Sequence, residues 1–371
     1  MTLRNLEYLF RPKSIAVIGA SDRTGSVGAT VMRNVLAGGF TGNVYAVNPS
    51  HARVAGHLAY ARIDDLPQAP DLAVIATPAP TVPGLIAALG ARGTRAAVVL
   101  SGGLTKAQSQ AMLQAARPHL LRVLGPNCVG LLAPHAGLNA SFAHTAALHG
   151  GIAFVSQSGG LTTAVLDWAK SRNIGFSHFV SLGEAADADF GDLLDYLASD
   201  ASTSAILLYI ELISGARKFM SAARAAARNK PVLVVKAGRA PEGARAAASH
   251  TGALAGSDTV YDAAFRRAGL LRVDTIQELF DAVETLAHAQ PVAGNRLAIL
   301  TNGGGPGVMA ADALSLRGGK LAALSDESLQ KLDAALPAPW PRANPVDIIG
   351  DAPVARYVAA LQALLDDSNN D

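Results

Sequence analysis

One local pattern occurs three times along this chain of 371 residues, and it limits the folds that the chain can adopt. A short apolar run leads into a turn rich in glycine and hydroxyl residues, which opens a helical pattern. The apolar runs are residues 14–18, 152–155 and 297–300, the turns are residues 19–28, 156–160 and 301–307, and the helical patterns are residues 29–37, 161–170 and 308–316. Apolar strands that alternate with helices are typical of buried parallel sheets. The pattern predicts an α/β fold whose helices begin with N–H groups that can hold an anion.

The first of these units continues into a domain of the nucleotide-binding type. Further strands are predicted at residues 44–47, 72–76, 96–100 and 122–124, and each ends in a polar turn that contains glycine or proline. Ligands of open parallel sheets bind at the carboxyl ends of the strands. We therefore expect residues 1–130 to form one domain whose turns line a single crevice.

A nicotinamide dinucleotide is one candidate ligand for the first glycine turn. The usual fingerprint reads G-x-G-x-x-G, with an acidic residue after the second strand for the ribose hydroxyls. Here Gly19 and Gly25 are six residues apart, and the second strand ends in Asn48 and Pro49. Both departures disfavour an NAD-dependent oxidoreductase, and tight NADH binding would revive this alternative.

The rest of the chain divides into a linker and two further α/β units. Residues 131–150 are predicted to be a linker, and its histidines, His135, His144 and His149, have no metal-site spacing and are expected at the surface. A second domain is predicted over residues 151–290, with strands at residues 178–181, 205–210 and 232–235 and helices at residues 189–198 and 216–227. Residues 295–371 begin a third unit, which we expect to be incomplete because it is short for an open α/β domain.

Residues 246–258 form a small-residue stretch with His250 in its middle. It follows a buried strand, and we expect a mobile loop on which the imidazole acts as a nucleophile and carries a group between two places. The alternative is a solvent-facing or capping histidine. Glu211 ends the predicted strand at residues 205–210, and an acid in that position needs a partner, for which His250 is a natural choice.

Other acidic residues, and the balance of charge, point to less specific roles. Glu184, Asp187, Asp189 and Asp192 are expected to be solvated or to cap a helix. The chain has 31 Lys and Arg against 29 Asp and Glu, a balance that disfavours nucleic acid and anionic membranes as partners. There is no apolar run of about 18 residues and no signal core near the N-terminus. The single cysteine, Cys128, fits a reducing compartment, so we expect the cytoplasm.

Five short segments, taken together and in order, resemble the nucleoside-diphosphate-forming acyl-CoA synthetases, the superfamily of succinyl-CoA synthetase and ADP-forming acetyl-CoA synthetase. They are Ser-Ile-Ala-Val-Ile-Gly-Ala-Ser at 14–21, Gly-Pro-Asn-Cys-Val-Gly at 125–130, Ser-Gln-Ser-Gly-Gly at 156–160, Ser-His-Thr-Gly-Ala-Leu-Ala-Gly at 249–256 and Asn-Gly-Gly-Gly-Pro-Gly at 302–307. The likeness covers nearly the whole chain. It implies a Rossmann-like CoA-binding domain followed by flavodoxin-like domains of the succinyl-CoA synthetase type.

The resemblance also implies which residues bind CoA. The phosphates would lie at the first glycine turn, the nucleotide end near the turn after the second strand, and the reactive thiol near the turn after residue 124. The implied CoA residues are Ser21, Thr24, Gly25, Ser26, Val27, Asn48, Pro49, Ser50, Thr77, Pro78, Ser101, Gly102, Gly103, Asn127 and Cys128.

For the ligase chemistry, the resemblance implies a phosphorylated His250 whose other ring nitrogen is held by Glu211. Two helix starts would hold the phosphoryl group. They comprise Ser156, Gln157, Ser158, Gly159 and Gly160 in one turn, and Asn302, Gly303, Gly304, Gly305 and Gly307 in the other. The reaction would interconvert acyl-CoA, ADP and phosphate with a carboxylic acid, CoA and ATP.

The family uses an ATP-grasp domain for ADP or ATP with Mg²⁺, and no such domain is visible in this sequence. We expect it further along a longer chain or on a partner subunit in an oligomer, so this chain would perform the CoA-side half-reaction. The alternative is a regulatory module of a protein lysine acetyltransferase, which would bind acyl-CoA without being phosphorylated. The sequence does not identify the carboxylic acid that is the substrate. No arginine can be assigned to the second carboxylate of succinate, which slightly disfavours succinate.

Overall fold

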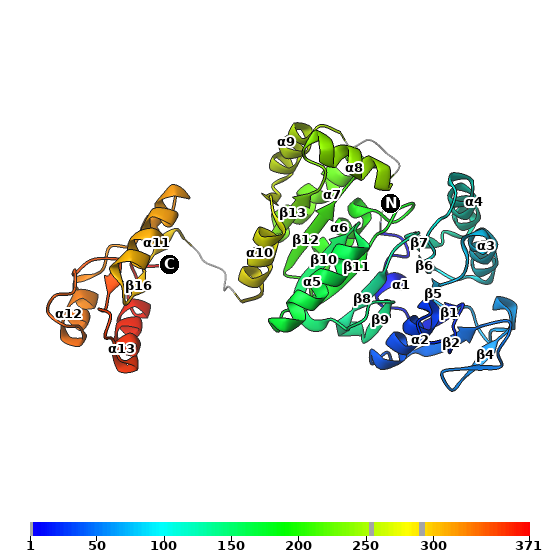
Figure 1. The fold of residues 1–371 in the computed structure, drawn as a ribbon, viewed down its shortest axis with the longest axis horizontal. Coiled ribbons are helices and arrows are strands. Elements are labelled where there is room, and N and C mark those ends of the chain that lie inside the picture. The colour runs from blue at the N-terminus through cyan, green and yellow to red at the C-terminus, as the bar shows by residue number, and fades with distance from the viewer. Residues whose placement is uncertain (1–2, 252–255, 289–293) are drawn as a thin grey trace. The chain divides into compact units, whose positions relative to one another are not determined.

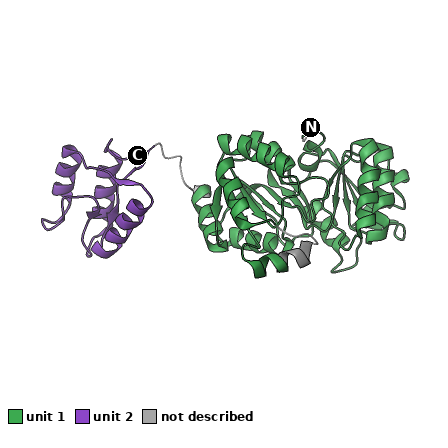
Figure 2. Cartoon of the chain, turned by 90° about the horizontal axis from the view of Figure 1, so that it is seen from above, with its two compact units in different colours: residues 1–288 green, residues 289–371 purple. Residues whose placement is uncertain are grey.

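The computed structural model describes residues 3–251, 256–288 and 294–371, with the backbone alone for residues 247–251 and 287–288. The chain divides into two compact units, Met1–His288 and Ala289–Asp371 (Figures 1 and 2). Within the described residues, no helix is both long and apolar enough to cross a membrane.

The first unit begins with a seven-stranded sheet in the order β3-β4-β2-β1-β5-β6-β7, parallel except between β3 and β4. Its strands are β1 (Ser14–Ile18), β2 (Asn43–Val47), β3 (Arg53–Val54), β4 (His57–Tyr60), β5 (Leu72–Ile75), β6 (Ala96–Val99) and β7 (Arg122–Leu124), and its helices are α1 (Glu7–Phe10), α2 (Val27–Ala37), α3 (Val82–Arg92) and α4 (Lys106–Ala116). Ile15 and Val17 pack with α2, whereas Ala16 and Ile18 pack with α3 and α4. Both faces of β1 are buried, which explains its continuous apolar run.

A second sheet in the same unit has the order β14-β13-β12-β10-β11-β8-β9. Its strands are β8 (Gly130–Ala133), β9 (Leu138–Ser141), β10 (Leu148–Ser156), β11 (Gly175–Ser181), β12 (Ala205–Ile210), β13 (Val232–Lys236) and β14 (Leu271–Val273), and its helices are α5 (Gly159–Ser171), α6 (Phe190–Ser199), α7 (Ala216–Asn229), α8 (Pro241–Thr251), α9 (Asp258–Ala268) and α10 (Ile276–His288). The strands from β14 to β11 are parallel, and β8 and β9 add an antiparallel edge.

The predicted linker at residues 131–150 is wrong, because β8, β9 and the start of β10 occupy it. Leu131, Leu138 and Ala140 are fully or almost fully buried there, so this hairpin completes the second sheet. Pro134 and Gly137 break the hydrophobic pattern into pieces that are too short to read as strands. The three histidines of this segment are exposed, as expected.

The predicted loop at residues 246–258 is also partly wrong. Helix α8 runs to Thr251, and α9 begins at Asp258. Alanines at 244 and 246–248 favour the helical backbone. Residues 252–255 and the side chain of His250 lie outside the described residues.

The second unit has two short parallel strand pairs. Its strands are β15 (Arg296–Leu297), β16 (Leu300–Thr301), β17 (Lys320–Leu321) and β18 (Val346–Asp347), and its helices are α11 (Gly304–Leu316), α12 (Asp326–Ala335) and α13 (Val354–Leu365). The single strand predicted at residues 297–300 is therefore divided in two. Leu332, Trp340, Val346, Ile348 and Leu364 form part of the core of this unit.

Candidate functional site

A cavity of about 650 Å³ lies where turns from the two sheets of the first unit meet. It is lined by Leu100, Asn127, Cys128, Val129, Phe142, Gln157, Gly159, Gly160, Thr163, Gly183, Glu184, Glu211 and Leu212. The turn after β7, the turn after β10 and the end of β12 all contribute to this wall. Three predicted groups of site residues, distant in sequence, therefore share one cavity.

The turn after β10 is held by its own hydroxyl groups. Ser156 Oγ accepts a hydrogen bond from Ser158 N and donates one to Ser158 O, both over 3.0 Å. Ser158 Oγ accepts from Leu161 N over 3.3 Å, so Ser158 is the N-cap of α5. Gly159 and Gly160 begin the helix beside the cavity, where free N–H groups and the helix dipole favour an anion.

Gln157 joins the ends of two neighbouring strands. Its Oε1 accepts hydrogen bonds from the backbone N–H of Glu211 over 2.7 Å and of Leu212 over 3.0 Å. Its Nε2 donates to Leu212 O over 3.1 Å. The side-chain amide of Gln157 therefore fixes the backbone at Glu211, which is 9% exposed in the wall of the cavity.

The turn after β7 presents one exposed and one buried residue. Asn127 has φ 57°, and a Cβ added to Gly102 would lie 2.7 Å from Asn127 Oδ1, so these two predicted residues pack together. Cys128 is 3% exposed, and its Sγ donates to Val99 O over 3.4 Å. Burial raises the pKa of the Cys128 thiol to about 12. Cys128 is therefore an inert wall residue rather than a nucleophile.

The first glycine turn is a tight contact between β1 and α2. Gly19 has φ 87°, and a Cβ added to Gly28 would lie 1.9 Å from Gly19 O. Ser26 is the N-cap of α2, with its Oγ 3.2 Å from Ala29 N. The neighbouring Thr24 and Gly25 are exposed. This helix start is open to a phosphate, as predicted for the CoA turn.

Other predicted CoA residues lie at the carboxyl ends of β2, β5 and β6. Asn48 Nδ2 donates to Ala20 O over 2.7 Å and thereby ties the end of β2 to the glycine turn. Ser101 Oγ donates to Thr77 O and ties the end of β6 to that of β5. Since β2, β1, β5 and β6 are parallel neighbours, these turns share one edge of the sheet. Pro49, Ser50, Pro78 and Gly103 are exposed along the same edge, and Ser21 and Val27 belong to the adjoining glycine turn.

The turn before α11 in the second unit repeats the geometry of the turn before α5. Thr301 Oγ1 accepts from Gly303 N over 3.1 Å and donates to Gly303 O over 2.8 Å. Asn302, Gly304 and Gly305 are exposed at this helix start, whereas Gly307 is buried. Each unit thus contains a hydroxyl-stabilised, glycine-rich turn that is suited to an anion.

Seven residues of the main cavity wall were not predicted as site residues: Leu100, Val129, Phe142, Thr163, Gly183, Glu184 and Leu212. Glu184, which the sequence suggested would be solvated or cap a helix, is exposed in this wall. Lys236 ends β13 and is 2% exposed, with Nζ 4.6 Å from the centre of the Tyr261 ring. Burial lowers the pKa of Lys236. Its signal in the sequence is a lysine that directly follows the apolar run at residues 232–235.

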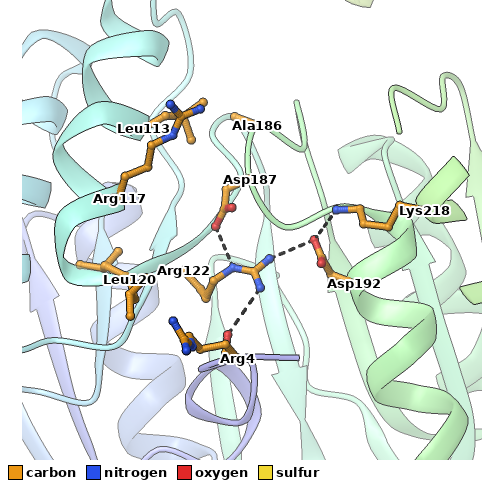
Figure 3. Close-up of a pocket in the computed structure, with 11 residues that line it drawn as sticks. Arg4, Leu113, Arg117, Leu120, Arg122, Ala186, Asp187, Asp192 and Lys218 are labelled. Carbon is orange, nitrogen blue, oxygen red and sulfur yellow. Dashed lines mark hydrogen bonds and ion pairs between the residues drawn. The ribbon is translucent and has the colours of Figure 1, made fainter. Parts of the chain in front are cut away.

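A second cavity, of about 730 Å³, lies beside Arg122 (Figure 3). Arg122 pairs with Asp187 and Asp192, each over 2.9 Å, and Lys218 also pairs with Asp192 over 2.9 Å. Asp192 is 2% exposed, and its Oδ2 accepts from Asp189 N over 3.1 Å, so Asp192 is buried and completes the capping box of α6, in line with the expected capping role. Asp189 caps α6, as expected, with Oδ1 2.9 Å from Gly191 N.

Family models match both halves of the first unit. A CoA binding domain matches residues 13–134, and a succinyl-CoA ligase like flavodoxin domain matches residues 149–286. Together with the paired turns, these matches define the chain as a ligase-type protein with a CoA-binding domain.

Relatives with named activities are similar over almost the whole chain. Acetate–CoA ligase [ADP-forming] I of Archaeoglobus fulgidus is 45% identical over 99% of this chain, which spans 54% of that relative. Subunit alpha of acetate–CoA ligase [ADP-forming] II of Pyrococcus furiosus is 40% identical over 99% of this chain and 81% of the relative. The chain thus spans about half the length of the first of these proteins and most of the second.

A solved structure is similar in fold as well. Acetyl-coenzyme A synthetase 1 of Ca. Korarchaeum cryptofilum, in complex with phosphate and ADP, has a TM-score of 0.95 and 38% identity over 99% of this chain and 80% of its own. The chain belongs to the family of ADP-forming acyl-CoA synthetases. The family and the fold class expected from the sequence are confirmed.

Proposed function

We propose that this chain is the CoA side of an ADP-forming acyl-CoA synthetase. Phosphate attacks the thioester carbonyl of a bound acyl-CoA, the C–S bond breaks, and CoA leaves as an acyl phosphate forms. His250 then attacks the phosphorus atom, which releases the carboxylic acid and leaves a phosphohistidine. The phosphoryl group finally passes to ADP.

The observation that carries this proposal is the shared wall of the 650 Å³ cavity. Thioester and phosphate must meet in one place, and Asn127 lines the same cavity as the α5 helix start at Gly159 and Gly160. Backbone N–H groups fixed at that start stabilise the charge on the transferring phosphoryl oxygens without reorganisation. Glu211, held by Gln157, supplies the carboxylate that orients the imidazole of His250 in this proposal.

Two parts of the proposal involve groups beyond the cavity. The exposed turn of α2, with Thr24, Gly25 and Ser26, holds the phosphates of CoA. The turn at residues 302–307 is the second anion site, used by the same phosphoryl group. ADP and Mg²⁺ are bound by an ATP-grasp domain, either further along a longer chain or on a partner subunit.

Phosphorylation of His250 is the direct test. The chain is incubated with phosphate, Mg²⁺ and a panel of acyl-CoAs, and mass spectrometry is used to find an acid-labile, base-stable adduct. We expect the adduct on His250 and none in His250→Ala. Binding of acyl-CoA without any adduct would contradict the proposal and favour a regulatory acyl-CoA-binding module.

Glu211 is tested in the same assay. Glu211→Gln keeps the shape of the side chain but removes its charge, so we expect phosphorylation to slow by about tenfold to a hundredfold. The affinity for CoA, measured by calorimetry, should not change. The turns proposed to bind CoA follow strands of the first sheet, whereas Glu211 follows β12 of the second sheet. A phosphorylation rate equal to that of the wild type would remove Glu211 from the mechanism.

A further inference from the structure

The acyl group must lie in the 650 Å³ cavity if the proposed function holds, and this inference rests on that function. The carbonyl carbon has to be within bonding distance of both the CoA sulfur and the attacking phosphate. Asn127 and Cys128 from one turn, and Gly159 and Gly160 from another, line this cavity. The chain of the acid therefore extends from a point between these two turns.

The described lining of this cavity is apolar and acidic. Leu100, Val129, Phe142 and Leu212 give it apolar surface, and Glu184 and Glu211 are its charged residues. The described lining includes neither lysine nor arginine. The nearby Lys218 is paired with Asp189 and Asp192, and Lys236 Nζ donates to Ala237 O.

The backbone of Glu184 is held in place by hydrogen bonds of its loop. Glu184 N donates to Pro126 O and Ala186 N to Gly125 O, both over 3.0 Å, so the loop runs along the turn after β7. Glu184 is exposed, and partial burial of its carboxylate, the larger effect, raises its pKa. The side chain of Asn127 lowers the pKa of Glu184.

A small chamber of about 50 Å³ continues beyond Glu184. Gln157, Glu184 and Leu212 line both spaces, so they form the boundary between them. Ala185, Phe190, Ile213 and Phe219 give the chamber apolar surface, and Asp189 and Ser214 also line it. An acyl chain that grows toward this chamber passes the carboxylate of Glu184 and then contacts these apolar side chains.

We propose that Glu184 is a specificity-determining residue that selects monocarboxylic acids with an apolar chain and excludes dicarboxylic acids. A second carboxylate on the acid meets the carboxylate of Glu184 at short range and finds no described cation in the cavity wall. Repulsion between these two carboxylates lowers the affinity of the cavity for a dicarboxylic acid. An apolar chain end is not repelled by Glu184, and contact with Phe142, Leu212 and the chamber stabilises its binding.

Butyryl-CoA and succinyl-CoA are matched probes, because their chains are similar in length and end in a methyl group and a carboxylate. Their binding to the chain is measured by calorimetry, with CoA itself as the reference. We expect the wild type to bind butyryl-CoA at least about tenfold more tightly than succinyl-CoA. In Glu184→Gln this preference should fall by about tenfold.

Glu284→Gln is the matched control, since Glu284 lies on α10 and is 54% exposed beside Arg172. It should keep the wild-type preference. Equal binding of the two thioesters by the wild type, or an unchanged preference in Glu184→Gln, would overturn the role of Glu184. Failure of the wild type to bind CoA and both thioesters would instead overturn the proposed function.

Discussion

Arg122 donates a hydrogen bond from Nε to Asp187 Oδ2 over 2.9 Å, and this contact joins the edge strand β7 to the loop that carries Glu184. The same carboxylate oxygen accepts from Val123 N over 2.8 Å. Arg122 also reaches Asp192 on α6, whose side chain is 3% exposed (Figure 3). One guanidinium therefore connects the first sheet to the loop and to a helix of the second sheet.

Arg122→Met should destabilise the chain by about 3 kcal/mol, because it leaves a buried carboxylate with one cation fewer. The change in the free energy of unfolding is measured by urea denaturation. Arg62→Met is the control: Arg62 pairs with Asp64, but the two side chains are 75% and 60% exposed, so the effect should stay below about 0.5 kcal/mol. A similar small effect in both variants would mean that the Arg122 network contributes little to folding.

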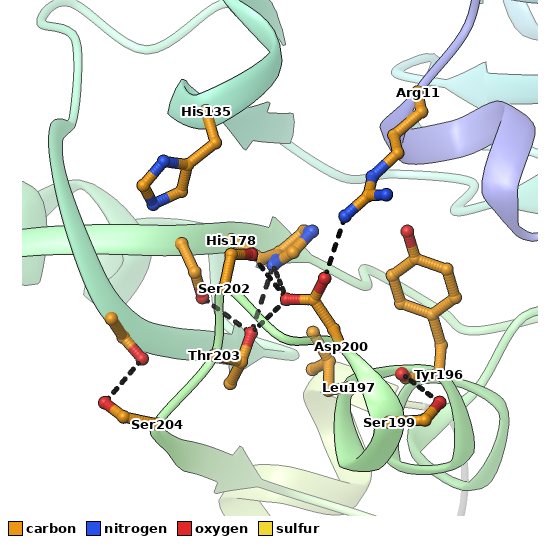
Figure 4. Close-up of polar contacts among 12 residues, drawn as sticks. Arg11, His135, His178, Tyr196, Leu197, Ser199, Asp200, Ser202, Thr203 and Ser204 are labelled. Carbon is orange, nitrogen blue, oxygen red and sulfur yellow. Dashed lines mark hydrogen bonds and ion pairs between the residues drawn. The ribbon is translucent and has the colours of Figure 1, made fainter.

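His178 is a buried imidazole in a polar cluster (Figure 4). Its side chain is 4% exposed, and Nδ1 lies 3.7 Å from Asp200 Oδ2 and 3.4 Å from Thr203 Oγ1. Phe10 packs against the ring edge to face, with centroids 4.8 Å apart. Burial is the main cause that lowers the pKa of His178 from 6.5 to about 4, despite the opposing effect of Asp200.

The chain should lose stability as the pH falls from about 6.5 toward 4, because the unfolded histidine binds a proton more readily than the folded one. Between about pH 7 and pH 5 the contribution of His178 to this loss is about 2 kcal/mol. His178→Gln should flatten the dependence of the urea midpoint on pH in that range. His149→Gln, at an exposed histidine, should leave the dependence as in the wild type. Parallel pH profiles for wild type and His178→Gln would refute the assignment.

Gly28→Ala should damage the CoA turn. A Cβ at this position would lie 1.9 Å from Gly19 O, so α2 must move away from β1. We expect a loss of about 1–3 kcal/mol of stability and weaker binding of CoA, by about tenfold or more. Gly84→Ala, in the first turn of α3 where nothing lies within 4 Å, should instead stabilise the chain by about 0.5–1 kcal/mol. Unchanged CoA affinity in Gly28→Ala would exclude this turn from the CoA site.

Cys128 should be unreactive in the folded chain. Its pKa of about 12 leaves little thiolate at neutral pH, and burial blocks access. Titration with a chromogenic disulfide should therefore be slower by about a hundredfold or more in buffer than in denaturing urea. Rapid modification of one thiol per native chain would show that the turn after β7 opens.

Local sequence was enough to predict most of the secondary structure and the anion-binding turns. The runs at residues 14–18, 152–155 and 205–210 are buried on both faces, so their apolar character is continuous and visible without knowledge of their neighbours. The glycine turns that follow are local in the same sense, because N-cap hydroxyls and helix starts involve residues close in sequence. Glu211 at the end of a buried strand was visible for the same reason.

Only the tertiary structure decided which of these parts meet. Gln157 accepts hydrogen bonds from the backbone of residues 211 and 212, and residues 184 and 186 donate to residues 126 and 125. These contacts join segments that have separate local signals. Strand β8 pairs with β11, and β9 pairs with β8, contacts that no periodicity over so few residues can reveal. Glu184 becomes part of the cavity, and Asp192 part of an ion-pair network, because parallel strands bring distant loops to one edge of a sheet.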